Sequence, residues 1–418
     1  MPHGGIKQSP FMINKSVARS LFSIPVIVAA LGYFVDIYDL LLFSIVRVPS
    51  LHALQVPDDQ LLSKGIYLIN MQMAGMLIGG IFWGILGDKK GRLSVLFGSI
   101  LLYSAANIAN GFVTNIDQYA LLRFIAGIGL AGELGAGITL VAEVLPKEIR
   151  GYGTSLVASV GVLGAVLAYF IADMYDWRIA YFIGGGLGLA LLVLRFNVFE
   201  SGIFKHIKEK NTSRGNFFML FTSKKRLLKY LRCIMIGLPI WFVIGILITF
   251  SPEFGKAIGL TEPVNAGKAV MFSYIGLSLG DMSSGILSQM LKSRRKTVAI
   301  FVLLTCGIVA IYLLQRTQSL AVFYGLCLLL GFAIGYWALF VTIGAEQFGT
   351  NMRATVATTV PNFVRGSVNL FTPLFLLGTA HVGVLGSAGL ILAGTALLAL
   401  WAVWKMEETF GKDLDYIE

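Results

Sequence analysis

Long apolar segments dominate this chain, and polar residues interrupt them only at intervals. A segment of about 20 apolar residues is what an α-helix needs to cross the hydrocarbon core of a bilayer. Of the 418 residues, 56% are hydrophobic and 13% are charged, whereas about 25% are charged in an average soluble protein. The segments lack the alternation over about ten residues that marks membrane β-barrels. The sequence therefore predicts an all-α membrane protein.

Twelve segments have the length and the polar flanks of membrane-spanning helices. We expect these helices near 21–46, 65–87, 93–113, 119–145, 151–173, 178–196, 231–251, 267–290, 297–315, 320–345, 354–378 and 386–405. The expected organisation is a cytoplasmic tail at 1–20, a six-helix bundle at 21–196, a cytoplasmic central loop at 197–230, a second six-helix bundle at 231–405 and a cytoplasmic tail at 406–418.

Positive charges are distributed unevenly between the loops. Most of the 33 Lys and Arg residues lie before the first apolar segment and in every second loop after it. Loops rich in Lys and Arg stay in the cytoplasm, so we expect both termini there, in the inner (cell) membrane of a bacterium. The net charge of +11 then reflects topology and contact with the lipid bilayer, and a nucleic acid partner is not expected.

Glycines recur at matching positions in the two halves of the chain. With an offset of 201 residues, Gly75 and Gly79 align with Gly276 and Gly280. The match indicates two related six-helix bundles with a pseudo-symmetric arrangement. In transporters built from such repeats, the substrate site lies between the repeats near the middle of the membrane.

One segment of the central loop is amphipathic. The residues Asn216–Arg232 mix large apolar side chains with Lys and Arg. Such a mixture is typical of a helix that lies on an anionic membrane surface. The alternative is a solvated linker whose positive charge only sets the topology.

Ionisable residues inside the apolar segments are the strongest candidates for functional groups, because a charge at the bilayer centre costs about 2.5–3.5 kcal/mol and usually marks a pathway. Asp36 and Asp39 lie three residues apart on one face of the first helix. Burial and like charge both favour the protonated carboxyl, so both acids are not expected to be ionised at neutral pH. Because the four histidines lie in tails and loops, we expect Asp36, Asp39 and Glu133 of the fourth helix to carry a coupling proton, with sodium as the alternative ion.

Arginines and polar residues on other helices are candidates for binding a substrate. Arg365 and Arg123 keep their positive charge and offer planar donors that match a carboxylate. Arg365 lies near Asn362 midway along the eleventh helix, and Asp281 of the eighth helix is a further candidate. The alternative role of Arg365 is a salt bridge to Asp281 or to the loop between the second and third helices. Glu133 is also a candidate partner for Arg123. Aromatic candidates near the expected midplane are Tyr38, Trp241, Tyr336 and Trp337.

The loop between the second and third helices carries the most specific motif. The segment Gly84–Leu96, G-I-L-G-D-K-K-G-R-L-S-V-L, resembles the signature loop of the major facilitator superfamily, although it has Leu93 where the family often has a second basic residue. The segment Arg123–Glu133, R-F-I-A-G-I-G-L-A-G-E, is similar to the arginine-glycine motif of the fourth helix in that family. The segment Glu143–Gly151 resembles the acidic and arginine pair of the next loop. The resemblance implies the major facilitator fold of twelve transmembrane helices and, usually, a monomer.

The spacing of Asp36, Tyr38 and Asp39 also resembles the first helix of proton symporters in this superfamily. The branches concerned are the metabolite, the aromatic-acid and the sialate/lactate:proton symporters. The sequence G-E-L-G around Glu133 supports this placement.

The signature loop also predicts a gate. Asp88 can form charge-assisted hydrogen bonds with Arg92, with Arg150 or with the eleventh helix, and such a latch would hold the bundles together on the cytoplasmic side. At an offset of 203 residues, Glu143 and Arg150 of the first half align with Glu346 and Arg353 of the second half. The expected gating residues are Gly84, Asp88, Gly91, Arg92, Glu143, Arg150, Glu346 and Arg353. The alternative is a positive loop that only sets topology.

Together these features predict a secondary transporter that imports a small organic anion, of carboxylate type, by proton symport through alternating access. The alternatives are a proton-coupled exporter of a drug, siderophore or metabolite, and a carrier of a zwitterion such as an amino acid. The sequence shows no nucleotide-binding glycine loop, metal-ligand cluster or nucleophile elbow. We therefore expect neither an enzyme nor a bound cofactor or metal.

Overall fold

The computed structural model consists of helices and short connections, without a strand in the part of the chain that it describes. The structure describes residues 22–90, 92–135, 150–200, 217–316, 318–349 and 352–412, together with residues 137, 141 and 145. Helices satisfy their own backbone hydrogen bonds, as a chain must do where no water is present.

The helices of the N-terminal half pack as one bundle. They are α2 (Ile24–Ala53), α3 (Leu61–Lys90), α4 (Arg92–Asn110), α5 (Ile116–Leu130), α7 (Arg150–Val162), α8 (Gly164–Met174) and α9 (Trp177–Glu200), with the 3₁₀ turn η1 (Asp58–Gln60) before α3. Local signals fix several of the ends. Pro25 stands in the first turn of α2, where its missing N–H costs nothing, and the side chain of Asn115 caps α5 by accepting from the Gln118 amide.

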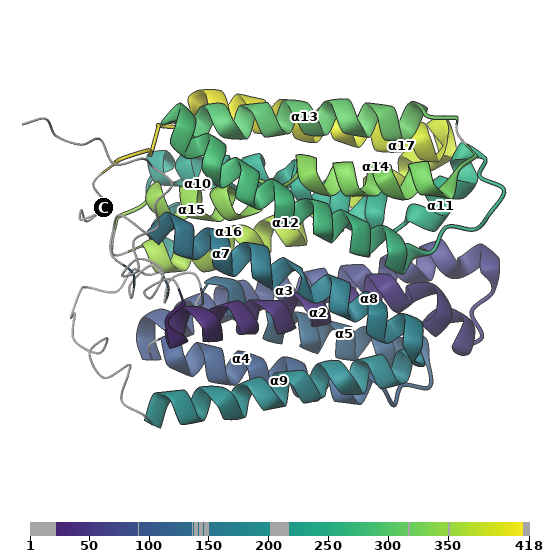
Figure 1. Cartoon of the computed structure of the whole chain (residues 1–418), viewed down its shortest axis with the longest axis horizontal. Coiled ribbons are helices and arrows are strands. Elements are labelled where there is room, and N and C mark those ends of the chain that lie inside the picture. Colours follow the sequence, from purple (N-terminus) through teal and green to yellow (C-terminus); the bar gives the residue numbers. More distant parts are fainter. Residues whose placement is uncertain are drawn as a thin grey trace, which may run out of the picture.

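The helices of the C-terminal half form the second bundle. They are the 3₁₀ turn η3 (Phe217–Phe221), α10 (Lys224–Phe242), the π-helical η4 (Val243–Ile248), α11 (Ser251–Ile258), α12 (Ala266–Leu291), α13 (Arg294–Leu314), α14 (Leu320–Ala333), α15 (Trp337–Glu346), α16 (Arg353–Gly366) and α17 (Val368–Lys405). Figure 1 shows the two bundles side by side, with α7 and α12 adjacent at their boundary. The start of α2 and the end of α17 lie at the same end of the bundles, called the termini side; the opposite end is called the far side.

Nine stretches of the described residues are long and apolar enough to cross a membrane. One of them, Thr355–Lys405, turns at Gly383, whose φ of 73° breaks the helix, so that it makes two crossings. The shorter helices α4, with its apolar stretch Ser94–Asn110, and α5 pack against α3 in the same bundle and complete the predicted set. The predicted set of twelve membrane helices is confirmed.

Several predicted helices are interrupted or longer than expected. The fifth divides at Leu163 into α7 and α8, and the tenth divides at Ile334–Tyr336 into α14 and α15. The seventh begins at Lys224 instead of residue 231 and changes to π-helix after Phe242. The length of an apolar segment predicts only the part of a helix that lies in the hydrocarbon. The start of α10 was therefore predicted too late, because this helix begins within the polar segment before the apolar residues.

The repeated glycines make the same contact in both bundles. A Cβ atom on Gly75 of α3 would overlap the carbonyl oxygen of Phe124 on α5, and a Cβ atom on Gly276 of α12 would overlap that of Leu328 on α14. A Cβ atom on Gly331 of α14 would likewise overlap the backbone of Ser273 on α12. Small residues allow membrane helices to approach until their backbones touch. The glycine repeat found in the sequence is therefore a repeat of helix–helix contacts.

We expect Gly331→Val to destabilise the protein, because a Cβ atom there would overlap the carbonyl oxygen of Ser273 on the neighbouring helix. Overpacking of this kind costs about 1–3 kcal/mol. Gly325→Val is the matched control, since it lies on the same helix with no atom within 4 Å of its Cβ position. Thermal unfolding in detergent should show a lower midpoint for Gly331→Val alone. Equal shifts for both variants would contradict the contact.

Candidate functional site

An ion pair joins the two bundles in the interior of the molecule. Asp36 of α2 and Arg365 of α16 are both buried, and Oδ2 of Asp36 lies 4.0 Å from Nη2 of Arg365. With Tyr33, Trp241 and Trp337, these two residues are called the central site. The sequence predicted both charged residues, and the structure brings them together.

The ion pair has unused hydrogen-bonding capacity. Neither carboxylate oxygen of Asp36 and none of the three guanidinium nitrogens of Arg365 has a hydrogen-bond partner among the described residues. The large majority of buried side-chain polar atoms in proteins have such a partner. The guanidinium fork matches a carboxylate in two parallel hydrogen bonds. The arrangement is therefore suited to an anionic ligand at Arg365 and a proton at Asp36.

Two indole rings flank the arginine. The guanidinium carbon of Arg365 lies 5.8 Å from the ring centre of Trp241 and 5.4 Å from that of Trp337. Both distances are within the range of cation–π contacts. The indole Nε1 of Trp337 donates a hydrogen bond of 2.9 Å to the hydroxyl of Tyr33 in the other bundle. The indoles therefore hold the arginine in place without using its N–H donors.

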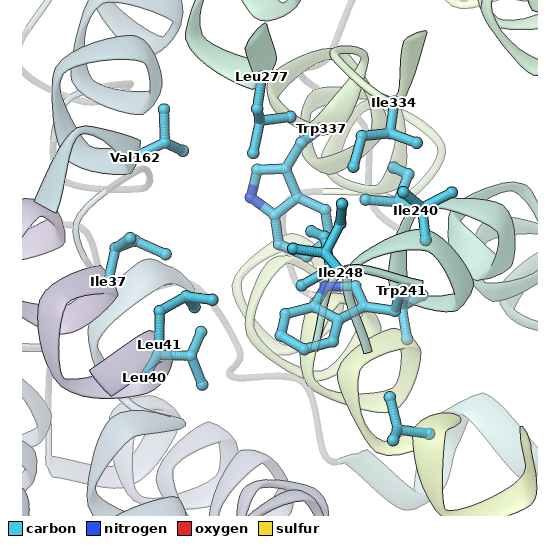
Figure 2. Close-up of a cluster of buried hydrophobic side chains, with 14 of the residues drawn as sticks. Ile37, Leu40, Leu41, Val162, Ile240, Trp241, Ile248, Leu277, Ile334 and Trp337 are labelled. Carbon is cyan, nitrogen blue, oxygen red and sulfur yellow. The ribbon is translucent and has the colours of Figure 1, made fainter. Parts of the chain in front are cut away.

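Apolar side chains complete the surroundings of the central site. Figure 2 shows Ile37 and Leu41 of α2 pointing toward Trp241 and Trp337, with Leu277 of α12 beside Trp337. All of these side chains are buried. A ligand beside Arg365 would therefore meet one cationic group within walls that are largely apolar and aromatic.

Asp281 positions one of the two indoles. Its Oδ1 accepts a hydrogen bond of 2.9 Å from the backbone N–H of Ala338, in the first turn of α15. A carboxylate at a helix N-terminus is favourable because it satisfies a free N–H group and meets the positive end of the helix dipole. This contact fixes the start of α15, where Trp337 is the first residue. Asp281 thus supports Trp337, and the charge close to Arg365 is that of Asp36.

Asp39 lies inside the N-terminal bundle rather than between the bundles. A Cβ atom on Gly184 of α9 would overlap Oδ1 of Asp39, and Arg123 of α5 is its electrostatic partner. Nη2 of Arg123 donates a hydrogen bond of 2.6 Å to Oδ1 of Asn107. The two acids of α2 therefore have separate arginines, one across the bundles for Asp36 and one within the bundle for Asp39.

Glu133 forms a buried ion pair that the sequence interpretation missed. Arg195 of α9 reaches Glu133 with two nitrogens, and the bond from Nη1 to Oε2 measures 3.1 Å. A Cβ atom on Gly32 of α2 would overlap this pair. Glu133 is thus paired with Arg195 and not with Arg123. Arg195 was not among the candidate residues, although its place directly after the apolar run L-L-V-L indicated burial.

Two predicted aromatic residues point away from the central site. The hydroxyl of Tyr38 donates a hydrogen bond of 2.9 Å to the carbonyl of Ala180 inside the N-terminal bundle. The hydroxyl of Tyr336 donates one of 3.0 Å to the carbonyl of Ile236 inside the C-terminal bundle. Both tyrosines therefore use their polar atoms within their own bundle.

The bundles also contact each other toward the termini side. The side-chain amide of Asn362 on α16 donates a hydrogen bond of 2.8 Å to the carbonyl of Ala131. A Cβ atom on Gly84 of α3 would lie 3.5 Å from Cγ2 of Thr359 on α16. Asn362 thus belongs to the bundle contact rather than to the central site, and Gly84 lies at the contact where the sequence predicted a gate.

Toward the far side, a second set of contacts joins the bundles. Nη2 of Arg47 on α2 lies 2.8 Å from Oε2 of Glu253 on α11, and Arg47 is fully buried. The hydroxyl groups of Ser44 and Thr249 lie 3.2 Å apart. Contacts between the bundles therefore occur on both sides of Arg365, and they enclose the central site from both ends.

The remaining gating predictions are only partly covered by the structure. Glu346 accepts hydrogen bonds from Nη2 of Arg294 at 3.3 Å and from the hydroxyl of Thr409 at 2.7 Å, both within the C-terminal bundle. Arg353 is the first residue of α16 on the termini side. The side chains of Asp88, Arg92, Glu143 and Arg150, and all of Gly91, lie outside the described residues.

The segment after α17 is tied to the start of α13. Glu408 accepts hydrogen bonds from the hydroxyl of Ser293 and from the backbone N–H of Arg294, the latter at 2.9 Å. Burial alone would raise the pKa of Glu408, but these hydrogen bonds outweigh it and lower the pKa below its usual value. Glu408 is therefore ionised at neutral pH and holds the termini-side ends of the C-terminal bundle together.

Comparisons with known proteins agree with this architecture. The family described as Major Facilitator Superfamily matches residues 29–373. The niacin transporter NiaP of Acinetobacter baylyi is 27% identical over 328 residues, which cover 69% of this chain and 72% of that protein. The 3-(3-hydroxy-phenyl)propionate transporter of Escherichia coli is 27% identical over 349 residues, or 80% of this chain and 84% of the relative.

A solved structure shows the same fold. The MFS proton:xylose symporter XylE, bound to 6-bromo-6-deoxy-D-glucose, superposes with a TM-score of 0.71 over 95% of this chain and 98% of the other. The two sequences are 18% identical in this alignment. The likeness therefore concerns the arrangement of the helices.

We expect Glu133→Gln to destabilise the protein, because it leaves the buried charge of Arg195 without a partner. Breaking a buried ion pair from one side costs about 3–5 kcal/mol, whereas replacing both partners by apolar residues is often neutral. The double variant Glu133→Leu/Arg195→Met should therefore unfold at a higher temperature than Glu133→Gln in detergent. An unchanged midpoint for Glu133→Gln would show that the pair does not support the fold.

Proposed function

Because this chain belongs to the Major Facilitator Superfamily, we propose that it imports a small organic carboxylate together with a proton. Its relatives are transporters and not enzymes. The observation that carries this proposal is the buried pair of Asp36 and Arg365, which lies between the bundles and receives no hydrogen bond from any described residue. A membrane protein rarely keeps such a pair unless it is part of a pathway.

The chemistry of the central site favours an aromatic or otherwise flat, apolar acid. Arg365 offers one fixed positive charge, and Trp241 and Trp337 offer the faces of two indole rings. Relatives of this chain are named as carriers of niacin and of 3-(3-hydroxy-phenyl)propionate, which both combine a carboxylate with an aromatic ring. In our proposal the substrate carboxylate binds Arg365 and its ring lies against the apolar wall.

Proton coupling follows from competition for one arginine. In the structure, Asp36 is the charged partner of Arg365. A proton taken up by Asp36 frees Arg365 for the substrate carboxylate, so the loaded site carries the same net charge as the empty one. When the proton leaves on the other side, Asp36 competes for Arg365 again and favours release of the substrate. Asp39 with Arg123 is proposed as a second group on the proton pathway.

Alternating access would require the two sets of bundle contacts to open in turn. The termini side, where Asn362 bonds to Ala131, is proposed to face the cytoplasm. The far side, where Arg47 bonds to Glu253, would open to the outside. We place the protein in a bacterial inner membrane on the basis of its loop charges.

We expect Arg365→Gln to weaken the binding of aromatic carboxylates by about 30-fold or more, because removing one member of a buried charge pair costs roughly 2 kcal/mol or more. Calorimetry with nicotinate, benzoate and 3-(3-hydroxyphenyl)propionate measures the loss. Arg178→Gln is the control, since Arg178 also lies on a tryptophan, Trp177, but at the far side. Unchanged affinity in Arg365→Gln would exclude the proposed anion site and favour a zwitterion carrier.

We expect Asp36→Asn to separate transport from its driving force. In proteoliposomes with an acidic outside, wild-type protein should accumulate substrate, and the accumulation should rise as the outer pH falls. Asp36→Asn cannot ionise, so it should still exchange internal for external substrate but lose the accumulation. The same pH dependence in the variant and in the wild type would assign the proton to another group, and Asp39→Asn tests that alternative. Accumulation driven by an acidic inside would indicate export.

A further inference from the structure

The segment where η3 meets α10, residues 217–232, has an amphipathic surface that the transport cycle does not use. In a 3₁₀ helix, residues three apart lie on the same face. Phe217 and Leu220 are buried, whereas Phe218 is 61% exposed and Phe221 is 50% exposed. The turn η3 therefore packs one face on the protein and presents two phenyl rings on the other.

The buried face holds η3 against the membrane bundles. The ring of Phe217 lies 6.4 Å from that of Phe363 on α16, and the ring of Tyr230 on α10 lies 6.0 Å from the same residue. α3 of the other bundle also contacts η3. The exposed phenyl rings are therefore fixed beside the two helices, α3 and α16, that join the bundles toward the termini side.

Positive charge follows directly after the exposed rings. Lys224 and Lys225 are exposed in the first turn of α10. The sequence from Phe217 to Pro252 contains no Asp or Glu. Leu228 and Leu231 continue the exposed face of α10, at 36% and 37% exposure. The helix face therefore changes from lysine to leucine in the direction of the membrane interior.

A second marker fixes the level of this face in the bilayer. Trp404 at the end of α17 is 67% exposed, and Lys405 lies 3.8 Å from its ring centre. Arg232 of α10 donates a hydrogen bond of 3.1 Å to the carbonyl of Lys405. Exposed tryptophan and basic residues of this kind gather at the membrane–water interface. Lys224 and Lys225 lie about two helical turns beyond Arg232, on the side of the water.

From these observations we propose that residues 217–232 bind an anionic phospholipid of the adjoining leaflet. Lys224 and Lys225 contact the headgroup, while Phe218, Phe221 and Leu228 contact the acyl chains. Basic residues next to an anionic membrane surface and apolar side chains that enter the interface act together in such sites. The amphipathic segment is thus a lipid site rather than a solvated linker.

Native mass spectrometry of the purified protein with added dioleoylphosphatidylglycerol tests the proposal, with dioleoylphosphatidylcholine as the neutral comparison. Wild-type protein should retain phosphatidylglycerol in preference to phosphatidylcholine. Lys224→Gln/Lys225→Gln should weaken the phosphatidylglycerol affinity about 25-fold, because each lysine near an anionic surface contributes roughly five-fold. Phe218→Ser/Phe221→Ser should weaken the binding of both lipids.

The control is Lys256→Gln/Lys268→Gln, which removes the same charge from exposed positions on the far side. The proposal requires that this variant binds phosphatidylglycerol as the wild type does. Equal affinity in the Lys224→Gln/Lys225→Gln variant and the wild type, or an equal loss in the control, would overturn it. Because the readout is lipid binding and not uptake, the result is independent of the proposed substrate and of proton coupling.

Discussion

A positive charge inside a membrane protein needs an opposite charge nearby, and this requirement organises the interior of the molecule. Arg47, Arg123, Arg195 and Arg365 are fully buried in the described part of the chain, and each faces an acid from another segment. Within the N-terminal bundle, Arg123 is the charge partner of Asp39 and Arg195 pairs with Glu133. Arg47 and Arg365 pair across the bundles. One set therefore holds a bundle together, and the other holds the two bundles to each other.

The two ion pairs between the bundles differ in the distance between their charged groups and in their hydrogen bonding. Arg47 bonds to Glu253 at 2.8 Å, and Glu253 is partly open to solvent. Arg365 and Asp36 are buried, their charged groups lie 4.0 Å apart, and neither group has a hydrogen bond to another described residue. The first pair is joined by a direct hydrogen bond, which suits a contact that closes one end. The second pair gains from an additional partner, which suits the place where a ligand and a proton meet.

The fold and the charged members of the site could be predicted from the sequence, but their partners could not. Apolar length gave twelve crossings, and the glycine offset gave the repeat, because both follow from local rules. Asp36, Asp39 and Arg365 stood out because a charge in an apolar segment is costly. Which arginine meets which acid depends on helix rotation and packing, so the separate partners of Asp36 and Asp39 were not predicted. Arg195 was missed because it lies where an apolar segment ends, and Tyr38 and Tyr336 could not be distinguished from the many other aromatic residues.

The glycine contacts that bring α3 onto α5 and α12 onto α14 have a further consequence. They join backbone to backbone, so they involve no rotamer and no titratable group. Neither acidification nor a membrane voltage changes their strength directly. In the proposed cycle, a response to the electrochemical gradient would therefore enter through the acid–arginine pairs of the described residues, while helices joined by glycine contacts would move as one unit.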